Sequence, residues 1–196
     1  IKRNSNFKIQ GHNYAKFYEE YFFEKKDREL NILEIGSFYG NAAAALYFYF
    51  KNAKIYSADI FPDLFSYASD RIKNFYVDSS SEESISQNIL KKEMKFEIII
   101  EDACHAYKDQ IISLFMLFPI LNSGGIFIIE ELDFPDTRAD MNLNNEKPTL
   151  RDILLSVKSG KNFENPLISK EQKDYFLNNF DKIIILKGNH NEIAII

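Results

Sequence analysis

The sequence is poor in several features on which whole classes of protein depend. It has one cysteine, Cys104, so no disulfide can form within the chain. It has no apolar run close to the roughly 20 residues that a membrane-spanning helix needs, and no apolar signal-peptide core near its start. Its lysines and arginines form no cluster, and the net charge is −5, which disfavours nucleic acid as a partner. These absences favour a cytoplasmic protein that acts on neither membranes nor nucleic acids.

The residues that are present are sufficient for a sizeable core. The chain has 196 residues, of which 45% are hydrophobic and 15% aromatic, so we expect one domain over residues 1–196. Within it we assign residues 1–30 to an N-terminal cap segment and residues 133–180 to a loop and helical insertion. Because the first residue is not methionine, we expect the natural chain to begin before Ile1.

Short β-rich runs alternate with longer amphipathic segments, which predicts an α/β fold with helices on both faces of a mostly parallel sheet. The last two runs are separated only by residues 188–191, a connection too short for a parallel crossover, so the sheet should contain an antiparallel C-terminal strand. The fold class is therefore a Rossmann-like, doubly wound, seven-stranded sheet. The predicted strands are residues 31–35, 54–59, 73–78, 96–101, 125–131, 181–187 and 192–196, with a turn at residues 122–125.

The segment before the last strands contains a long polar connection and two helix-start signals. Residues 133–148 are rich in Asn and Asp and too long for a routine loop, so they form either an active-site lid or a solvated insertion. Thr149 with Asp152, and Ser169 with Gln172, have the spacing of capping boxes. We therefore expect a helix to begin after each of these two residues.

A tight glycine loop follows the first predicted strand. That strand ends near an acid, and the loop has the pattern Glu34-x-Gly36-x-x-x-Gly40, in which the glycines allow a sharp turn before a helix. The third glycine of a dinucleotide fingerprint is missing, so a pyrophosphate ligand is disfavoured. The second predicted strand ends at Asp59, and an acid at this place accepts hydrogen bonds from ribose hydroxyls. The pattern indicates a nucleoside ligand.

Acidic residues follow the two central predicted strands. Glu101 and Asp102, with His105 three residues later, follow one strand, and Glu130 and Glu131 follow the next. Because the carboxyl ends of parallel neighbours meet at one edge of a sheet, these groups should converge where α/β proteins bind substrates. Four carboxylates in one place favour a divalent cation. Oxygen ligands with a single imidazole suit Mg²⁺, Mn²⁺ or Ca²⁺ better than Zn²⁺, and Mg²⁺ is our first choice.

The two strand-loop motifs together resemble those of class I S-adenosylmethionine-dependent methyltransferases. The predicted strand arrangement resembles the sheet of that family as well, over almost the whole chain. The resemblance implies that the cofactor is S-adenosylmethionine. It implies a cofactor site made of Glu34, Gly36, Ser37, Phe38, Gly40, Asp59, Ile60, Asp78 and Asp102.

A closer resemblance is carried by residues 96–105 and by the run from Gln110 to Leu132. These segments look like the metal-dependent sugar O-methyltransferases of macrolide and bacterial polysaccharide biosynthesis, which read Asp-Asp-Gly-Ser-His and later Ile-Glu-Asp-Leu. This chain differs at three places, with Glu101 for the first Asp, Ala-Cys for Gly-Ser, and Glu131 for the last Asp. The resemblance implies metal ligands at Asp102, Glu130 and Glu131, catalytic roles for His105 as base and for Asp102, and substrate contacts at His12, Tyr14 and Tyr107.

Each of these residues also has a purely structural explanation. The loop glycines suffice for any sharp turn, and the acids at the strand ends suit solvated loops. Asp78 is either a turn residue or a contact on the adenine side. A lone histidine is more often structural than catalytic, and only its spacing from Asp102 distinguishes His105. His12 and Tyr14 also suit surface or packing positions.

The sequence thus predicts an S-adenosylmethionine-dependent O-methyltransferase, assisted by Mg²⁺ or Mn²⁺, that acts on a hydroxyl of a nucleotide-linked sugar or a glycoside. Two alternatives stay open. One is a catechol-type O-methyltransferase acting on a small diol. The other is a catalytically inert module that only binds S-adenosylmethionine. The expected partner is a small molecule, and self-association into a homo-oligomer also stays open.

Overall fold

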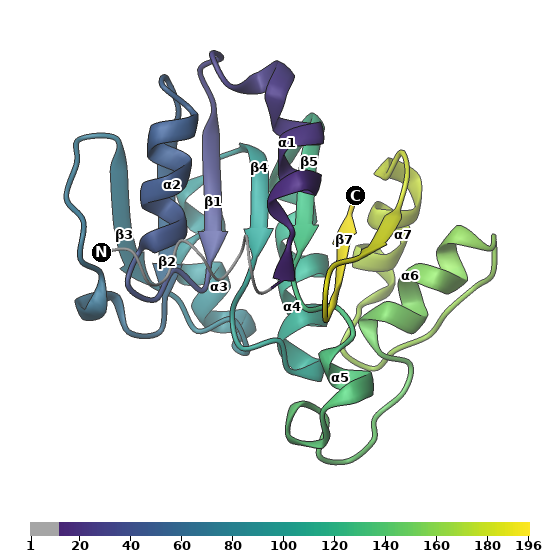
Figure 1. The fold of residues 1–196 in the computed structure, drawn as a ribbon. Coiled ribbons are helices and arrows are strands. Elements are labelled where there is room, and N and C mark those ends of the chain that lie inside the picture. The colour runs from purple at the N-terminus through teal and green to yellow at the C-terminus, as the bar shows by residue number, and fades with distance from the viewer. Residues whose placement is uncertain (1–11) are drawn as a thin grey trace.

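The structure is a computed structural model that describes residues 12–196. Its centre is one seven-stranded sheet with the strand order β3-β2-β1-β4-β5-β7-β6 (Figure 1). Strands β1 to β5 pair in parallel, and β7 is antiparallel to both of its neighbours. The predicted fold class is confirmed. The strands are β1 (Asn31–Ile35), β2 (Lys54–Asp59), β3 (Ile72–Tyr76), β4 (Phe96–Glu101), β5 (Leu121–Ile129), β6 (Ile184–Lys187) and β7 (Glu192–Ile195).

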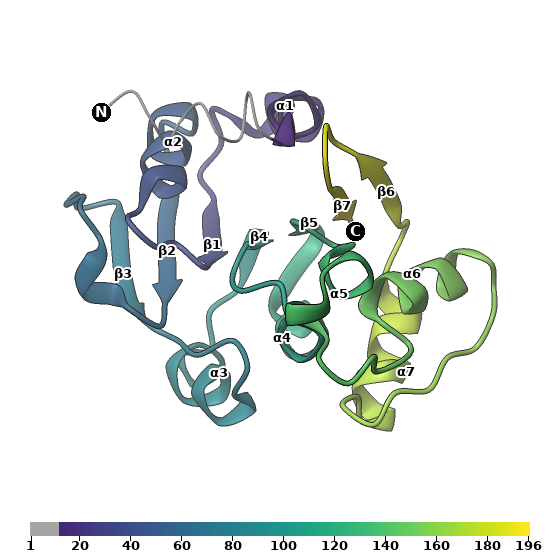
Figure 2. The same ribbon diagram turned by 60° about the horizontal axis from the view of Figure 1, so that its bottom comes forward.

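Helices cover both faces of this sheet. Figure 2 shows α1 and α2 on one face, and α3, α4, α6 and α7 on the other. The residues of β4 alternate between the two cores: Ile98 and Ile100 pack with α2, whereas Ile99 packs with α4. The helices are α1 (Ala15–Phe22), α2 (Asn41–Tyr49), α3 (Glu82–Asn88), α4 (Tyr107–Leu117), α5 (Phe134–Thr137), α6 (Leu150–Lys158) and α7 (Lys170–Asn179).

Strand β3 ends two residues earlier than predicted, at Tyr76 rather than at Asp78. The amide of Val77 still donates to the carbonyl of Asp59, but the amide of Asp78 donates to the hydroxyl of Ser84 instead of to β2. The side chain of Ser84 therefore turns the chain away from the sheet.

Strand β5 is displaced toward the N-terminus relative to the prediction. Residues 122–125, predicted as a turn, lie inside the strand, where Gly124 has a φ of +71° and the pairing with β4 skips from Leu121 to Ile126. The strand ends at Ile129 rather than at residue 131, because Glu131 takes a left-handed conformation with a φ of +47°. The two acids after β5 therefore lie outside the sheet, at its edge.

The C-terminal hairpin is shorter than predicted. Strand β6 begins at Ile184 rather than at residue 181, because β7 offers it partners only from Glu192 to Ile195. Among residues 12–196, no helix combines the length and the apolar character that crossing a bilayer requires.

Both predicted capping boxes are present. The hydroxyl of Thr149 accepts the amide of Asp152 at the start of α6, and that of Ser169 accepts the amide of Gln172 at the start of α7. In the polar connection before α6, α5 is followed by a loop that the buried side chain of Asn142 closes through hydrogen bonds to the backbone of residues 135 and 146.

Candidate functional site

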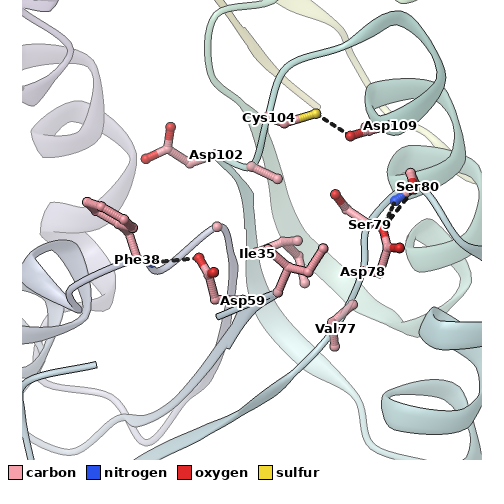
Figure 3. A pocket seen from close by; sticks show the side chains of 13 residues that line it. Ile35, Phe38, Asp59, Val77, Asp78, Ser79, Ser80, Asp102, Cys104 and Asp109 are labelled. Carbon is pink, nitrogen blue, oxygen red and sulfur yellow. Dashed lines mark hydrogen bonds between the residues drawn. The ribbon is translucent and has the colours of Figure 1, made fainter. Parts of the chain in front are cut away.

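A pocket of about 440 Å³ opens at the carboxyl edge of the sheet, between the ends of β1, β2, β3 and β4. Strands β2 and β3 lie on one side of β1 in the sheet, and β4 and β5 lie on the other, so the direction of the strand order reverses at β1. Such a switch point is where α/β sheets bind ligands. Figure 3 shows Phe38, Asp59 and Asp102 on one side of it and Asp78, Ser80 and Asp109 on the other. We call it the first pocket. It is lined by Ile35, Gly36, Phe38, Asp59, Ile60, Val77, Asp78, Ser79, Ser80, Asp102, Ala103, Cys104 and Asp109.

The glycine loop forms the floor of the first pocket. Gly36 has a φ of +91°, and a Cβ placed there would lie 2.1 Å from the carbonyl oxygen of Asp102. Only glycine therefore lets the loop after β1 touch the loop after β4. Gly40 has a φ of +81° and packs against the ring of Phe65, where a Cβ would lie 2.4 Å from a ring carbon. It shapes the loop without lining the pocket.

Asp59 ties two loops together at the wall of the pocket. Its Oδ2 accepts a hydrogen bond from the amide of Phe38 at 2.7 Å, and its Oδ1 accepts one from the amide of Phe61 at 2.8 Å. The side chain is mostly buried, with 8% of its residue surface exposed. Since each carboxylate oxygen has a second lone pair, Asp59 retains acceptor capacity toward the pocket.

At the far end of the pocket, Asp78, which was predicted from the sequence, lies with Ser80 and Asp109, which sequence reasoning missed. Asp78 accepts hydrogen bonds from the amide and the hydroxyl of Ser80, at 2.9 and 2.7 Å. The thiol of Cys104 donates to the carboxylate of Asp109 (Figure 3). Burial and this contact raise the pKa of Cys104 to about 12, and burial raises the pKa of Asp109. The Cys104 thiol is therefore neutral near pH 7 and no nucleophile.

Most of the predicted cofactor residues line the first pocket, but three do not. Glu34 is buried, with 1% of its surface exposed, and Ser37 is 5% exposed. Within the loop, the amide of Gly40 donates a hydrogen bond to the carbonyl of Ser37 at 2.6 Å. The six predicted residues that line the pocket are Gly36, Phe38, Asp59, Ile60, Asp78 and Asp102.

A second pocket, of about 380 Å³, adjoins the first and shares Asp102 with it. One side-chain atom each from Asp102, His105 and Glu131 lies within 4.8 Å of the others, as a metal site requires. The Nε2 atom of His105 lies 3.8 Å from Oδ1 of Asp102 and 3.6 Å from Oε2 of Glu131. The second pocket is lined by His12, Asp102, His105, Glu130, Glu131, Phe134 and Arg138.

Two residues of the second pocket have strained backbone. His105 has a φ of +61° and Glu131 one of +47°, a region that residues with a Cβ rarely occupy. Each such residue costs of order 1–3 kcal/mol and persists only where the surrounding structure imposes it, and such residues cluster at functional sites. The predicted ligand and base therefore project from turns whose backbone is held in place by the fold.

The structure places Glu130 apart from the other three. Its carboxylate lines the same pocket, but Oε1 accepts a hydrogen bond from the hydroxyl of Tyr18 on α1. Glu131 is contacted instead by His12, whose Nδ1 lies 2.9 Å from Oε1. The sequence predicted Asp102, Glu130 and Glu131 as the three metal ligands. In the structure, the three side chains whose ligand atoms converge are Asp102, His105 and Glu131.

Glu101 does not face the second pocket. It follows the alternation of β4 to the α4 side, where it is fully buried and its Oε1 accepts the amide of Ala103 at 3.3 Å. Burial raises the pKa of Glu101 to about 8, so the side chain is mostly neutral at pH 7. Of the four carboxylates expected at this edge, three line the second pocket.

The N-terminal residues reach the site through the hairpin between β6 and β7. The carbonyl of His12 accepts the amide of Asn189 at 2.9 Å, and Asn191 lies 3.2 Å from Nδ1 of His12. Gly188 packs against the backbone of His12, where a Cβ would lie 2.2 Å from its carbonyl oxygen. The hairpin turn therefore holds His12 at the pocket, which its sequence did not indicate.

Two residues predicted to contact substrate lie elsewhere. Tyr14 is fully buried and its hydroxyl donates to the carbonyl of Glu192 at 3.1 Å. Tyr107 is 5% exposed and its hydroxyl accepts from Asn165 at 2.8 Å. Neither lines the pockets described, and both connect segments of the fold. Phe134 and Arg138, in contrast, line the second pocket, and no spacing signal marked them.

Comparisons with known proteins show similarity to methyltransferases in sequence and in fold. No family model matches the chain. Over 128 residues, which are 62% of this chain and 33% of the relative, it is 28% identical to the 8-demethyl-8-alpha-L-rhamnosyl tetracenomycin-C 2'-O-methyltransferase of Streptomyces olivaceus. It is 25% identical over 128 residues to the demethylmacrocin O-methyltransferase of Streptomyces fradiae, with 62% of this chain and 32% of that protein covered. The chain spans about a third of the length of these relatives.

A solved structure shows the same fold. The MycE methyltransferase from the mycinamycin biosynthetic pathway, in complex with Mg, SAH and mycinamycin VI, superimposes with a TM-score of 0.71 at 20% identity, over 95% of this chain and 48% of that one. The chain therefore has the fold of class I S-adenosylmethionine-dependent methyltransferases, and it resembles the sugar O-methyltransferases of natural-product biosynthesis.

Proposed function

We propose that the chain is an S-adenosylmethionine-dependent O-methyltransferase that uses a divalent metal ion and methylates a hydroxyl of a sugar, either in a glycoside or in a nucleotide-linked sugar. One observation carries the proposal. Asp102 lines both pockets, so a donor in the first and an acceptor in the second would meet across a single side chain. The likeness to sugar O-methyltransferases and to a fold neighbour crystallised with SAH and Mg supports it.

The first pocket suits the nucleoside end of S-adenosylmethionine. Asp59 lies where it can accept hydrogen bonds from the ribose hydroxyls, and the apolar side chains of Val77 and Ile60 can pack against the adenine ring. The glycine loop brings backbone close to the ligand without a Cβ in the way. Bound there, S-adenosylmethionine supplies a methyl group activated by its sulfonium charge.

The second pocket suits a hard divalent ion. Asp102 and Glu131 bring like charges close together, which is costly unless a cation offsets them, and Glu130 adds a third carboxylate to the same pocket. Carboxylate oxygens are the preferred ligands of Mg²⁺, and a nearby imidazole also admits Mn²⁺. We assign Asp102 and Glu131 as the residues that would hold the ion; Glu130, which the sequence also indicated, is engaged by the hydroxyl of Tyr18 and lies outside the group whose side-chain atoms converge. Bound there, the ion would lower the pKa of a sugar hydroxyl and favour its alkoxide.

His105 is proposed as the base. A neutral imidazole can accept the proton that the sugar hydroxyl loses, and His105 lines the pocket proposed for the acceptor. Asp102 and Glu131, at 3.8 and 3.6 Å from Nε2, would stabilise the imidazolium after the transfer. The remaining task is alignment, because methyl transfer is an in-line displacement that needs donor and acceptor held in register.

The surroundings of the second pocket favour a small neutral or polar acceptor. It is lined by three carboxylates, which can accept hydrogen bonds from hydroxyl groups, and by the guanidinium of Arg138, which can donate them. Phe134 contacts the edge of the His105 ring, with centroids 5.3 Å apart, and forms an apolar wall on which the face of a sugar ring can pack. Specificity would therefore reside in α5 and the N-terminal residues around His12.

Calorimetry with S-adenosylhomocysteine tests the cofactor assignment, and methylation assays on glycosides and nucleotide sugars, with and without chelator, test the rest. His105→Ala should keep S-adenosylhomocysteine affinity and lose methyl transfer. The control is His190→Ala, which changes an exposed histidine in the hairpin turn and should keep both. No binding at millimolar ligand refutes the cofactor site. If small catechols are methylated and sugars are not, the proposed acceptor class is wrong. If turnover is unchanged in excess chelator, the proposed role of the metal ion is wrong.

A further inference from the structure

We propose that Gln110 is a positioning residue for the metal site, which fixes the turn that carries Glu130 and Glu131. The inference rests on the proposed function, because it concerns the ion assigned to that turn. Gln110 lies on α4, touches neither pocket, and is fully buried. Its contribution would come through the backbone of the two carboxylate residues and not through contact with the ion or the acceptor.

The side-chain amide of Gln110 binds the turn directly. Its Nε2 donates to the carbonyl oxygen of Glu131 at 3.0 Å and lies 3.5 Å from that of Glu130. The carbonyl of Glu131 also accepts the amide of Phe134 at 3.0 Å. The backbone of Glu131, with its left-handed φ of +47°, is therefore held from α4 on one side and from the start of α5 on the other.

Gln110 also joins the two loops on which the site is built. Asp102 and His105 lie in the loop between β4 and α4, and Gln110 follows on the first turns of α4. Glu130 and Glu131 lie in the loop after β5, and that loop meets α4 through the amide of Gln110. One side chain thus sets the separation of carboxylates that come from different loops, which for Mg²⁺ has to match a nearly ideal octahedral geometry.

The burial of this amide is difficult to explain by stability alone. Among the described residues, the Oε1 atom of Gln110 has no hydrogen-bond partner, and an unsatisfied buried acceptor costs free energy. A methionine of similar length would fill the same space without that cost, but it would lose the hydrogen bond from Nε2 to the carbonyl of Glu131. Groups that orient metal ligands through hydrogen bonds are typically worth a factor of about 10 to 100 in metal affinity.

The test compares Gln110→Met with the unmodified chain and with Ser113→Ala. Ser113 is the matched control, because it is fully buried on the same helix, and its hydroxyl makes no hydrogen bond to either loop or to any other described residue. Three quantities are measured: Mn²⁺ affinity by electron paramagnetic resonance, S-adenosylhomocysteine affinity by calorimetry, and the midpoint of thermal unfolding.

Gln110→Met should weaken Mn²⁺ binding at least about 10-fold and leave S-adenosylhomocysteine affinity unchanged. The metal concentration that half-activates methyl transfer should rise by the same factor. The unfolding midpoint should change little, because the lost hydrogen bond and the removed unsatisfied acceptor offset each other. Ser113→Ala should move none of these. Unchanged Mn²⁺ affinity in Gln110→Met overturns the inference alone. A parallel loss of stability and of both ligands also overturns it, because the role is then structural. No Mn²⁺ binding by the unmodified chain overturns the metal assignment together with the inference.

Discussion

Replacing Glu101 by glutamine should stabilise the protein, by an amount that grows with pH. Glu101 is fully buried, and its pKa rises from an ordinary 4.5 to about 8 because burial penalises the carboxylate. Its Oε1 accepts the amide of Ala103, and Oε2 has no partner among the described residues. Glutamine reproduces the shape of the neutral acid and can still accept that hydrogen bond, but it cannot ionise.

The sign and the size follow from proton linkage. Between pH 4.5 and 8 the folded protein keeps a proton on Glu101 that the unfolded chain releases, so folding becomes less favourable as the pH rises. The pKa difference between the two states is worth about 5 kcal/mol above pH 8, and about 3 kcal/mol at pH 7. Below pH 4.5 both states are protonated, and the glutamine variant should differ from the unmodified chain by a constant.

The assay is urea unfolding of both proteins in chelator at several pH values from 4 to 9. The difference in free energy of unfolding should rise through this range and level off above about pH 8. Asp109, whose pKa burial also raises, is present in both proteins, so only its charge coupling to Glu101 enters the difference. Ser113→Ala has no titrating group and should give a difference that is flat with pH. A flat difference for Glu101→Gln would refute the reasoning, since Glu101 would then titrate alike in both states.

Three further changes probe the site and the fold separately. Gly36→Ala should cost at least about 2 kcal/mol of stability and abolish S-adenosylhomocysteine binding in calorimetry, because its Cβ would meet the backbone of Asp102; wild-type affinity would contradict the proposed loop contact. Asp59→Ala should weaken S-adenosylhomocysteine binding at least about 10-fold, since it loses charged hydrogen-bond acceptors; an affinity within a factor of two would argue against a ribose contact. Thr149→Ala should lower the free energy of unfolding by about 1 kcal/mol through loss of the α6 cap to Asp152, while cofactor affinity stays the same; a change in affinity would mean that the cap also shapes the site.

Much of the architecture was readable from short stretches of sequence. The alternation of β-rich and amphipathic runs predicted the doubly wound, mostly parallel sheet, and the short last connection predicted its antiparallel strand. Thr149 and Ser169 marked two helix starts that the structure contains. Glycines at 36 and 40 marked a turn with positive φ. These features depend on periodicity and on side chains a few residues apart, which are local properties.

The direction in which side chains point after a strand ends was not readable in this way. The spacing of the acids grouped Glu101 with Asp102, and Glu130 with Glu131. In the structure Glu101 is buried against α4 and Glu130 accepts a hydrogen bond from Tyr18, so neither belongs to the group formed by Asp102, His105 and Glu131, whose side-chain atoms converge. Within a strand, the alternation of side chains fixes which face of the sheet each one points to. Beyond the end of the strand this alternation stops, and contacts with distant segments decide the direction of each side chain.

By itself the sequence determined that this protein folds as a doubly wound sheet, with a glycine loop and acidic residues at one edge, because hydrophobic periodicity and turn chemistry act over a few residues. Only the tertiary structure decided that Asp102 lies between two pockets, that the hairpin turn holds His12 at one of them, and that Gln110 supports the turn of Glu131. The physical reason is that these contacts join segments far apart in the chain. Their geometry depends on left-handed backbone at His105 and Glu131, which packing imposes and no local preference predicts.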